Sequence, residues 1–284
     1  MTTAERADVL SEALPYIRRF YKKTVIVKYG GSAMQDGEIR RDAISDIVLL
    51  SLVGVRVVVV HGGGPEINAA LRRMGIEPRF ADGLRYTDEE TMDVVQMVLC
   101  GKTGKDLAGL ISSMGGKAVS LSGLDGSMLM AKRLGPGDYG LVGEITAVDT
   151  APIDMALDNG YIPVVSTVAQ GADGAAAYNI NADTAAAELA AALGAEKLIL
   201  LTDVRGLCAD PDDDTTLLRQ VSIGDIPGLV KNGVVRGGML PKIDCCVHAV
   251  RRGVKRVHIL DGRIPHAILI EMLTDAGIGT MILP

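Results

Sequence analysis

Seven short apolar runs, separated by helix-length segments, constrain the fold of this 284-residue chain most strongly. Most of the runs are continuous rather than alternating, which predicts strands that are covered on both faces. Strands that alternate with helices indicate a mainly parallel sheet with helices on both sides. The runs span residues 24–27, 55–60, 118–121, 162–166, 197–201, 256–260 and 280–283. We therefore expect an α/β fold.

Composition excludes several classes of protein. Hydrophobic residues make up 48% of the chain and aromatic residues only 3%, so the core must rest on aliphatic side chains. A formal net charge of −6, with the basic residues scattered, argues against nucleic acid as the main partner. Four cysteines without a C-x-x-C pair favour a reducing compartment over a disulfide framework or zinc site. No secretory signal or membrane span is visible, so we expect a soluble, cytoplasmic protein that does not bind membranes.

Two of the predicted strands end in glycine. Residues 24–31 read Thr-Val-Ile-Val-Lys-Tyr-Gly-Gly, and residues 61–64, after the second run, read His-Gly-Gly-Gly. Glycines at a strand end let a ligand reach backbone N–H groups, and three in a row exceed what a tight turn needs. Lys28 adds a positive charge, and Pro65 begins a predicted helix whose N-terminus favours anions. These features predict an anion-binding site.

Two familiar nucleotide-binding motifs fail in this sequence. Gly101-Lys102-Thr103 looks like the end of a P-loop, but the glycine required five residues earlier is Gln96. In the loop at residues 62–64, the third glycine of G-x-G-x-x-G would fall at Ile67. A nicotinamide-dependent oxidoreductase on a doubly wound sheet is therefore the weaker alternative.

A second group of candidate site residues lies further along the chain. Arg85 precedes a predicted helix and has the planar fork that holds a carboxylate in bidentate fashion. Asn179 and Asn181, two residues apart, point the same way from an extended segment. Asp183 follows at the start of an Ala-rich helix, where it could serve the site or simply be the N-cap. The three polar side chains together favour a site.

Lys242 occupies an unusual place for a cation. It lies in the first turn of a predicted helix that follows Gly237 and Gly238 and contains Pro241. A positive charge there opposes the helix dipole, so a purely structural role is disfavoured unless an anion compensates.

The N-terminal segment predicts one more element. Leu10, Leu14, Ile17 and Tyr21 fall on one face at helical spacing. This amphipathic helix could pack on its own subunit or between subunits, and the sequence leaves both alternatives open.

In order along the chain, these segments resemble the amino acid kinase family, and within it the members that phosphorylate N-acetyl-L-glutamate in arginine biosynthesis. The matching segments are residues 28–31, 61–65, 83–85, 179–183, 202–206 and 237–242, which span nearly the whole chain. The resemblance implies a three-layer α/β/α sandwich with a mainly parallel central sheet. It also implies an oligomerisation helix at residues 1–22, an N-terminal lobe at 23–180 that binds N-acetyl-L-glutamate, and a C-terminal lobe at 181–284 that binds ATP with Mg²⁺.

The resemblance further implies a role for each matching residue. Lys28 and Lys242 would stabilise the transferring phosphoryl group, and Asp183 would orient them. The residues that would hold the acid are Gly63, Gly64, Arg85, Asn179 and Asn181. The residues that would line the nucleotide are Gly30, Gly31, Thr202, Asp203, Gly206 and Gly238. A carboxylic acid with a pKa of about 4.3 is already ionised at neutral pH, so this chemistry needs positioning and electrostatics rather than a general base.

The two ends of the chain resemble arginine-inhibited, ring-forming members of the family. This similarity implies feedback inhibition by L-arginine and a homohexamer built as a trimer of dimers. The residues that would form the arginine site are Tyr21, His266, Glu271, Gly277 and Gly279. Whether a PII-type signalling protein binds is left open.

Two further alternatives remain at this point. A kinase for an N-modified aminoadipate differs in substrate by one methylene, which is worth only ~1–3 kcal/mol. A catalytically silent metabolite sensor would use the arginine site alone, but it would not need Lys28, Lys242 and Asp183.

Overall fold

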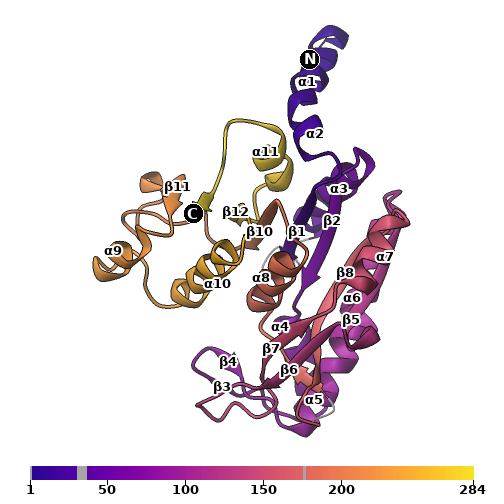
Figure 1. The fold of residues 1–284 in the computed structure, drawn as a ribbon, viewed down its shortest axis with the longest axis vertical. Coiled ribbons are helices and arrows are strands. Elements are labelled where there is room, and N and C mark those ends of the chain that lie inside the picture. Colours follow the sequence, from indigo (N-terminus) through magenta and orange to yellow (C-terminus); the bar gives the residue numbers. More distant parts are fainter. Residues whose placement is uncertain (1, 31–36, 175–176) are drawn as a thin grey trace.

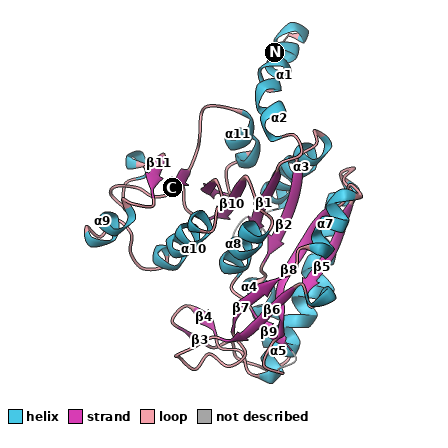
Figure 2. Cartoon of the chain, viewed as in Figure 1, coloured by secondary structure: helices cyan, strands magenta, loops and turns pink. Residues whose placement is uncertain are grey.

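The computed structural model describes residues 2–30, 37–174 and 177–284. Across these residues, eleven strands form one sheet in the order β11-β13-β12-β10-β1-β2-β8-β6-β7, with β5 and β9 also paired to β8 (Figures 1 and 2). The strands are β1 (Thr24–Tyr29), β2 (Arg56–His61), β5 (Ala118–Gly123), β6 (Leu129–Arg133), β7 (Gly143–Val148), β8 (Ile162–Gly171), β9 (Ala177–Asn179), β10 (Lys197–Thr202), β11 (Gln220–Ser222), β12 (Arg256–Asp261) and β13 (Thr280–Leu283). All seven predicted strands are present.

The centre of the sheet is parallel, as predicted. β12, β10, β1, β2 and β8 run in one direction, whereas β13, β7 and β9 pair antiparallel to β12, β6 and β8. β1 pairs with β10, so the sheet continues across the boundary predicted near residue 180. The predicted lobes therefore share one central sheet.

Helices cover both faces of the sheet, which confirms the three-layer α/β/α sandwich. On one face lie α3 (Gly37–Leu52), α6 (Gly104–Ser113) and α11 (Ala267–Leu273), and on the other lie α7 (Ala151–Asp158), α8 (Ala182–Ala192) and α10 (Met239–Arg251). Successive residues of β1 face opposite layers: Val25 and Val27 pack toward α3, and Ile26 packs toward α8. All three are fully buried, which explains why the strand reads as a continuous apolar run.

Smaller elements complete the fold around the strand ends. They are α4 (Gly64–Arg73), the hairpin β3 (Phe80–Ala81) and β4 (Leu84–Arg85), α5 (Glu89–Gln96) with its π-helical continuation η2 (Met97–Thr103), the 3₁₀ turns η3 (Asp125–Ser127) and η4 (Asp214–Thr216), and α9 (Ile226–Lys231). None of the described helices is both long and apolar enough to cross a membrane.

The N-terminal helices α1 (Thr3–Glu12) and α2 (Leu14–Phe20) extend away from the body of the molecule (Figure 1). Phe20 is only 2% exposed and anchors α2 to the core beneath α3 and α11. By contrast, Leu10 is 75% exposed and Leu14 is 47% exposed in the single chain. The predicted apolar face exists, and most of it is uncovered by the rest of its own subunit.

Candidate active site

Parallel register brings the predicted site residues to one edge of the sheet. Lys28 near the end of β1 lies beside Val60 of β2 on one side and Leu200 of β10 on the other. The glycine loop after β2 and Thr202 at the end of β10 therefore flank it. This is the carboxyl edge of the parallel strands, where ligands bind in open α/β sheets.

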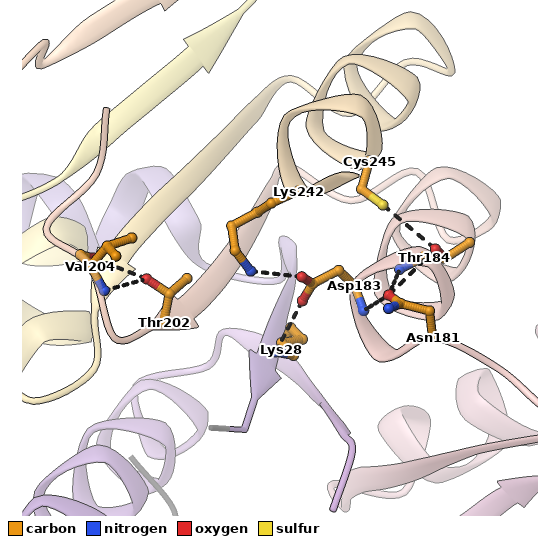
Figure 3. Close-up of polar contacts among 8 residues, drawn as sticks. All are labelled: Lys28, Asn181, Asp183, Thr184, Thr202, Val204, Lys242 and Cys245. Atoms are coloured by element: carbon orange, nitrogen blue, oxygen red, sulfur yellow. Dashed lines mark hydrogen bonds and ion pairs between the residues drawn. The ribbon is translucent and has the colours of Figure 1, made fainter. Parts of the chain in front are cut away.

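Asp183 lies between Lys28 and Lys242 at this edge. Its Oδ1 is 3.0 Å from the Lys28 Nζ, and its Oδ2 accepts a hydrogen bond from the Lys242 Nζ at 2.7 Å. Figure 3 shows the two amino groups directed at the carboxylate from β1 and from α10. All three side chains are at most 17% exposed. The structure thus brings together the three residues predicted as catalytic.

The start of α8 explains why Asp183 has this orientation. Asn181 is the N-cap: its Oδ1 accepts hydrogen bonds from the backbone N–H groups of Asp183 at 2.9 Å and Thr184 at 3.2 Å. The alternative that Asp183 is itself the cap is wrong, because Asp183 lies inside the first turn. A carboxylate there is favoured by the helix dipole. The cap therefore leaves the Asp183 side chain available to both lysines.

The two lysines also control the protonation state of Asp183. Burial alone would raise the pKa of this carboxyl group, but the charges and hydrogen bonds of Lys28 and Lys242 outweigh burial and hold its pKa below the ordinary value. Two ammonium groups and one carboxylate leave an excess of one positive charge. The centre is therefore suited to an anion that arrives beside the lysines.

A pocket of about 210 Å³ opens on one side of this centre, lined by Gly62, Gly63, Gly64, Arg85, Asn179, Asn181 and neighbouring apolar side chains. Arg85 is only 9% exposed, and its Nη2 donates to the Gly64 carbonyl oxygen at 3.1 Å. Its Nη1 is buried without a hydrogen-bond partner within the described structure. A buried, unpaired guanidinium nitrogen is costly unless a ligand oxygen accepts from it.

Asn179 is fixed on the wall of the same pocket. Its Nδ2 donates to the Thr87 Oγ1 at 3.2 Å, and the Thr87 hydroxyl donates in turn to the Arg85 carbonyl oxygen at 2.9 Å. Thr87 is fully buried and was not predicted. This chain of hydrogen bonds links Asn179 to the Arg85 segment, so both walls of the pocket are held together.

A second pocket, of about 380 Å³, lies on the other side, beyond β10. Asp203 and Gly206, two of the residues predicted to bind the nucleotide, line this pocket. The Thr202 hydroxyl accepts from the Val204 N–H at 3.0 Å and so shapes the loop that follows β10 (Figure 3). Three arginines also line the pocket: Arg205, which belongs to the matching segment 202–206, and Arg236 and Arg263, which were not among the predicted nucleotide-binding residues. Arg236 is paired with Asp212 and Arg263 with Asp261, so a phosphate-bearing ligand would compete with these carboxylates for the guanidinium groups.

The remaining predicted nucleotide-binding glycines lie close to the catalytic centre or outside the described residues. Gly30 is adjacent to the Lys28 side chain, because a Cβ at Gly30 would lie 3.4 Å from the Lys28 Nζ. Gly238 is the N-cap of α10, the helix that carries Lys242. Gly31 falls in residues 31–36 and lies outside the part of the chain that the structure describes.

A third pocket, of about 320 Å³, lies between α2 and the C-terminal segment. Glu271, Gly277 and Gly279, three of the residues predicted for an arginine site, line this pocket together. It also contains Tyr16 and two buried residues that were not among the predicted site residues, Lys197 and His258. His258 begins the C-terminal stretch that resembles the arginine-inhibited members, whereas the only sequence signal for Lys197 was a basic residue within an apolar strand.

Within this third pocket, Glu271 is held in place by its neighbours. Its Oε1 lies 2.9 Å from the His258 Nδ1, and its Oε2 accepts from the Ile278 N–H at 3.1 Å. Burial would raise the pKa of Glu271, but the hydrogen bonds from His258 and the Ile278 N–H, together with the charge of Lys197, outweigh it and keep that pKa below its ordinary value.

Two residues predicted for the arginine site lie elsewhere. The Tyr21 ring packs over Gly54, where a Cβ would come within 2.4 Å of it, and lines a separate pocket beside β2. His266 directs its Nδ1 to the Asp46 carboxylate at 2.7 Å, beside α3. The structure therefore does not bring Tyr21 and His266 to the pocket that contains Glu271. A one-dimensional helical pattern could not choose between Tyr16 and Tyr21.

Comparisons with known proteins agree with this geometry. The amino acid kinase family model matches residues 23–261. Acetylglutamate kinase of Clostridium kluyveri is 54% identical over 99% of this chain and 100% of its own length, and that of Nostoc punctiforme is 56% identical over 99% and 94%.

A solved structure with a similar fold is N-acetylglutamate synthase from Neisseria gonorrhoeae. Its complex with coenzyme A and N-acetyl-glutamate has a TM-score of 0.84 at 29% identity, and its complex with coenzyme A and L-arginine has 0.80 at 27%. Each covers 98% of this chain, which spans 63% and 65% of those longer chains. The family match, the near-complete overlap with the kinases and the paired lysines agree, and this chain belongs to the acetylglutamate kinases of the amino acid kinase family.

Proposed function

We propose that this protein transfers the γ-phosphoryl group of ATP to the side-chain carboxylate of N-acetyl-L-glutamate. The products would be ADP and N-acetyl-L-glutamyl 5-phosphate, an intermediate of L-arginine biosynthesis. The observation that carries the proposal is the Lys28–Asp183–Lys242 cluster between two pockets, one with an unpaired buried guanidinium and one lined by arginines. The names of the related kinases support the same substrate.

In the proposed mechanism, Arg85 and Asn179 hold the acid while its ionised side-chain carboxylate approaches the γ-phosphate. The barrier is repulsion between two anions, and Lys28 and Lys242 reduce it by donating to the phosphoryl oxygens. Asp183 keeps both ammonium groups in place before the substrates arrive, so little reorganisation accompanies the reaction. No proton has to be removed from the attacking carboxylate at neutral pH.

We further propose that residues 23–180 bind the acid and residues 181–284 bind ATP. Mg²⁺ that enters with ATP would supply positive charge that neutralises part of the phosphate charge. Within the described structure, no group of three or more His, Cys, Asp or Glu side chains is arranged to hold a metal ion. Both oxygens of Asp183 already face lysines. We propose that the ion enters with the nucleotide.

An ADP-release assay with Mg-ATP tests the proposed function. We expect turnover with N-acetyl-L-glutamate and little turnover with N-acetyl-aminoadipate or L-glutamate. Preference for the aminoadipate would identify the protein as a kinase for an N-modified aminoadipate instead. No turnover with any of the acids would support a catalytically silent metabolite sensor.

We also propose that L-arginine inhibits the enzyme by binding in the pocket that contains Glu271. The carboxylate of Glu271, fixed by His258 and the Ile278 N–H, is suited to a guanidinium or ammonium group. The arginine complex of the Neisseria synthase, with its similar fold, supports a ligand of this kind. We expect arginine to raise the apparent KM for the acid, and Glu271→Gln to weaken arginine inhibition without changing kcat. Undiminished inhibition of that variant would contradict this site.

Finally, we propose a homohexamer, built as a trimer of dimers, that works in the cytoplasm. The uncovered leucines of α1 and α2 support an intersubunit role for these helices. The four cysteines are free, which fits a reducing compartment.

A further inference from the structure

His61 is a buried titratable residue to which the mechanism above assigns no role. It ends β2 immediately before the glycine loop, and its side chain is fully buried. Its Nδ1 lies 2.9 Å from the carbonyl oxygen of Gly62. A carbonyl oxygen can only accept, so the hydrogen of this bond belongs to Nδ1. The imidazole ring is thus tied to the first peptide of the loop.

The ring is neutral at physiological pH. Burial lowers the pKa of His61 to about 4, against a smaller opposing effect of the hydrogen bond to Gly62. With its one hydrogen on Nδ1, the Nε2 atom carries none, and it has no hydrogen-bond partner within the described structure. The environment therefore selects one tautomer, the one that donates to the loop.

The ring is also fixed by packing on its far side. Gly104 of α6 approaches it so closely that a Cβ there would lie 3.1 Å from the His61 Nε2 and 2.6 Å from the Ser120 Oγ. The imidazole thus fills the space between the glycine loop and α6.

The hydrogen bond has a consequence for the next peptide group. In a planar trans peptide, the carbonyl of one residue and the N–H of the next point in opposite directions. Because the Gly62 carbonyl faces the buried ring, the Gly63 N–H faces away from it, and Gly63 lines the pocket that also contains Arg85 and Asn179. Glycines have no side chain to restrict such a peptide, so an external contact has to fix its orientation.

We propose that His61 is a positioning residue: through its Nδ1–H bond to the Gly62 carbonyl, it aims the Gly63 N–H at an anionic oxygen of the bound substrate. The inference rests on the proposed function and deepens it by naming what holds the glycine loop. His61 itself contacts no substrate. Its effect on catalysis passes through one backbone donor of the loop.

Two variants of His61 and one control variant test the hydrogen bond. In His61→Asn, the side-chain amide nitrogen can take the place of Nδ1 and keep the donor. In His61→Leu, the side chain fills the space but has no donor. We expect His61→Leu to lower kcat/KM for N-acetyl-L-glutamate by about tenfold to a hundredfold, somewhat less than outright loss of an oxyanion donor. His61→Asn should stay within about threefold of the wild type, because the backbone donor is retained. The KM for ATP should be unchanged in both, and exposed His248→Leu is the matched control.

Equal losses in the Asn and Leu variants, at similar melting temperatures, would overturn the proposal, as would wild-type kcat/KM in His61→Leu. A readout without activity is the ¹⁵N NMR spectrum of the histidine-labelled protein, which contains only four histidines. We expect the His61 signal to report a hydrogen on Nδ1, and a hydrogen on Nε2 would contradict the proposal. If the wild type shows no turnover, the proposed function fails, while the NMR result still decides whether the His61 Nδ1 donates to the glycine loop.

Discussion

At the scale of single residues, one carboxylate between two ammonium groups defines the centre of the site. Asp183 lies 3.0 Å from the Lys28 nitrogen and 2.7 Å from the Lys242 nitrogen, so neither lysine is free to turn into solvent. Each ammonium group has three N–H donors and uses only part of them on Asp183. The remaining donors can point at an incoming phosphoryl group without any change in the pairing.

Lys28→Ala and Lys242→Ala should each lower kcat by about a hundredfold or more, because each removes a donor that stabilises the transition state. Single-turnover and steady-state kinetics of the purified variants measure this loss. Lys132→Ala is the control, since Lys132 is 57% exposed on β6, where it pairs with Glu144. Wild-type kcat in either active-site variant would contradict the assignment.

His61 should make stability depend on pH. Its pKa is about 4 in the folded protein and about 6.5 when unfolded, so between these values only the unfolded chain binds the proton. Stability is therefore present above pH 6.5 and lost on acidification, by up to about 3 kcal/mol near pH 4. Urea unfolding at several pH values should show a shallower acid loss in His61→Asn than in the wild type. Parallel curves would show that His61 does not stay neutral.

The sequence allowed the three residues of the lysine–aspartate cluster to be predicted, but not all of their partners. Lys28, Asp183 and Lys242 stand out because each is a charge at the end of a strand or the start of a helix. His61 precedes the predicted glycine loop, yet its role depends on which way its ring points. That direction follows from packing against Gly104, more than forty residues away in the chain.

At the scale of elements, the start of α8 shows how a local cap serves the site. Asn181 satisfies two of the first backbone N–H groups of the helix and thereby sets where its first turn begins. Asn181 also lines the pocket that contains Arg85 and Asn179. It therefore combines its structural role as a cap with a position suited to the predicted substrate contact.

Asn181→Ala should lower the free energy of unfolding by about 1 kcal/mol, because the cap is lost. Asn181→Ser keeps a capping oxygen and should cost less. If Asn181 also contacts the acid, both variants should raise the KM for N-acetyl-L-glutamate. If Asn181 is only a cap, any rise in this KM should be confined to the alanine variant, which has lost the capping oxygen. Denaturant unfolding together with substrate kinetics separates the two roles. Unchanged stability of Asn181→Ala would contradict the capping role.

The long parallel strands could be predicted because both of their faces are buried. β6 and β7 were missed, since both contain exposed charged positions and lie at one end of the sheet, with β7 as its edge strand. β9 and β11 have three residues each, too few for a periodic signal. Their positions depend on pairing with β8 and β13, which is tertiary information.

At the scale of the whole molecule, α1 is the part of the fold least explained by a single chain. Phe20 ties α2 to the core, and its ring also lies 4.9 Å from the Lys197 nitrogen. α1 beyond it exposes Val9 and Leu10. Exposed apolar side chains on a projecting helix are typical of a contact between subunits.

Removal of residues 1–13 should convert the proposed hexamer to a smaller assembly, while the anchor at Phe20 and the active site remain. Size-exclusion chromatography with light scattering measures the mass, and the kinase assay should give an unchanged kcat. The double variant Leu10→Ser, Leu14→Ser should behave similarly without shortening the chain. A wild-type mass for both proteins would contradict the intersubunit role of α1.

The central claim is that the two pockets and the lysine cluster between them transfer a phosphoryl group to a carboxylate. The most direct measurement is transfer of the γ-phosphoryl group from labelled ATP, with the acyl phosphate trapped by hydroxylamine. The account predicts hydroxamate formation that requires N-acetyl-L-glutamate and is lost in Lys242→Ala. ADP release without hydroxamate, or hydroxamate that persists in Lys242→Ala, would contradict it.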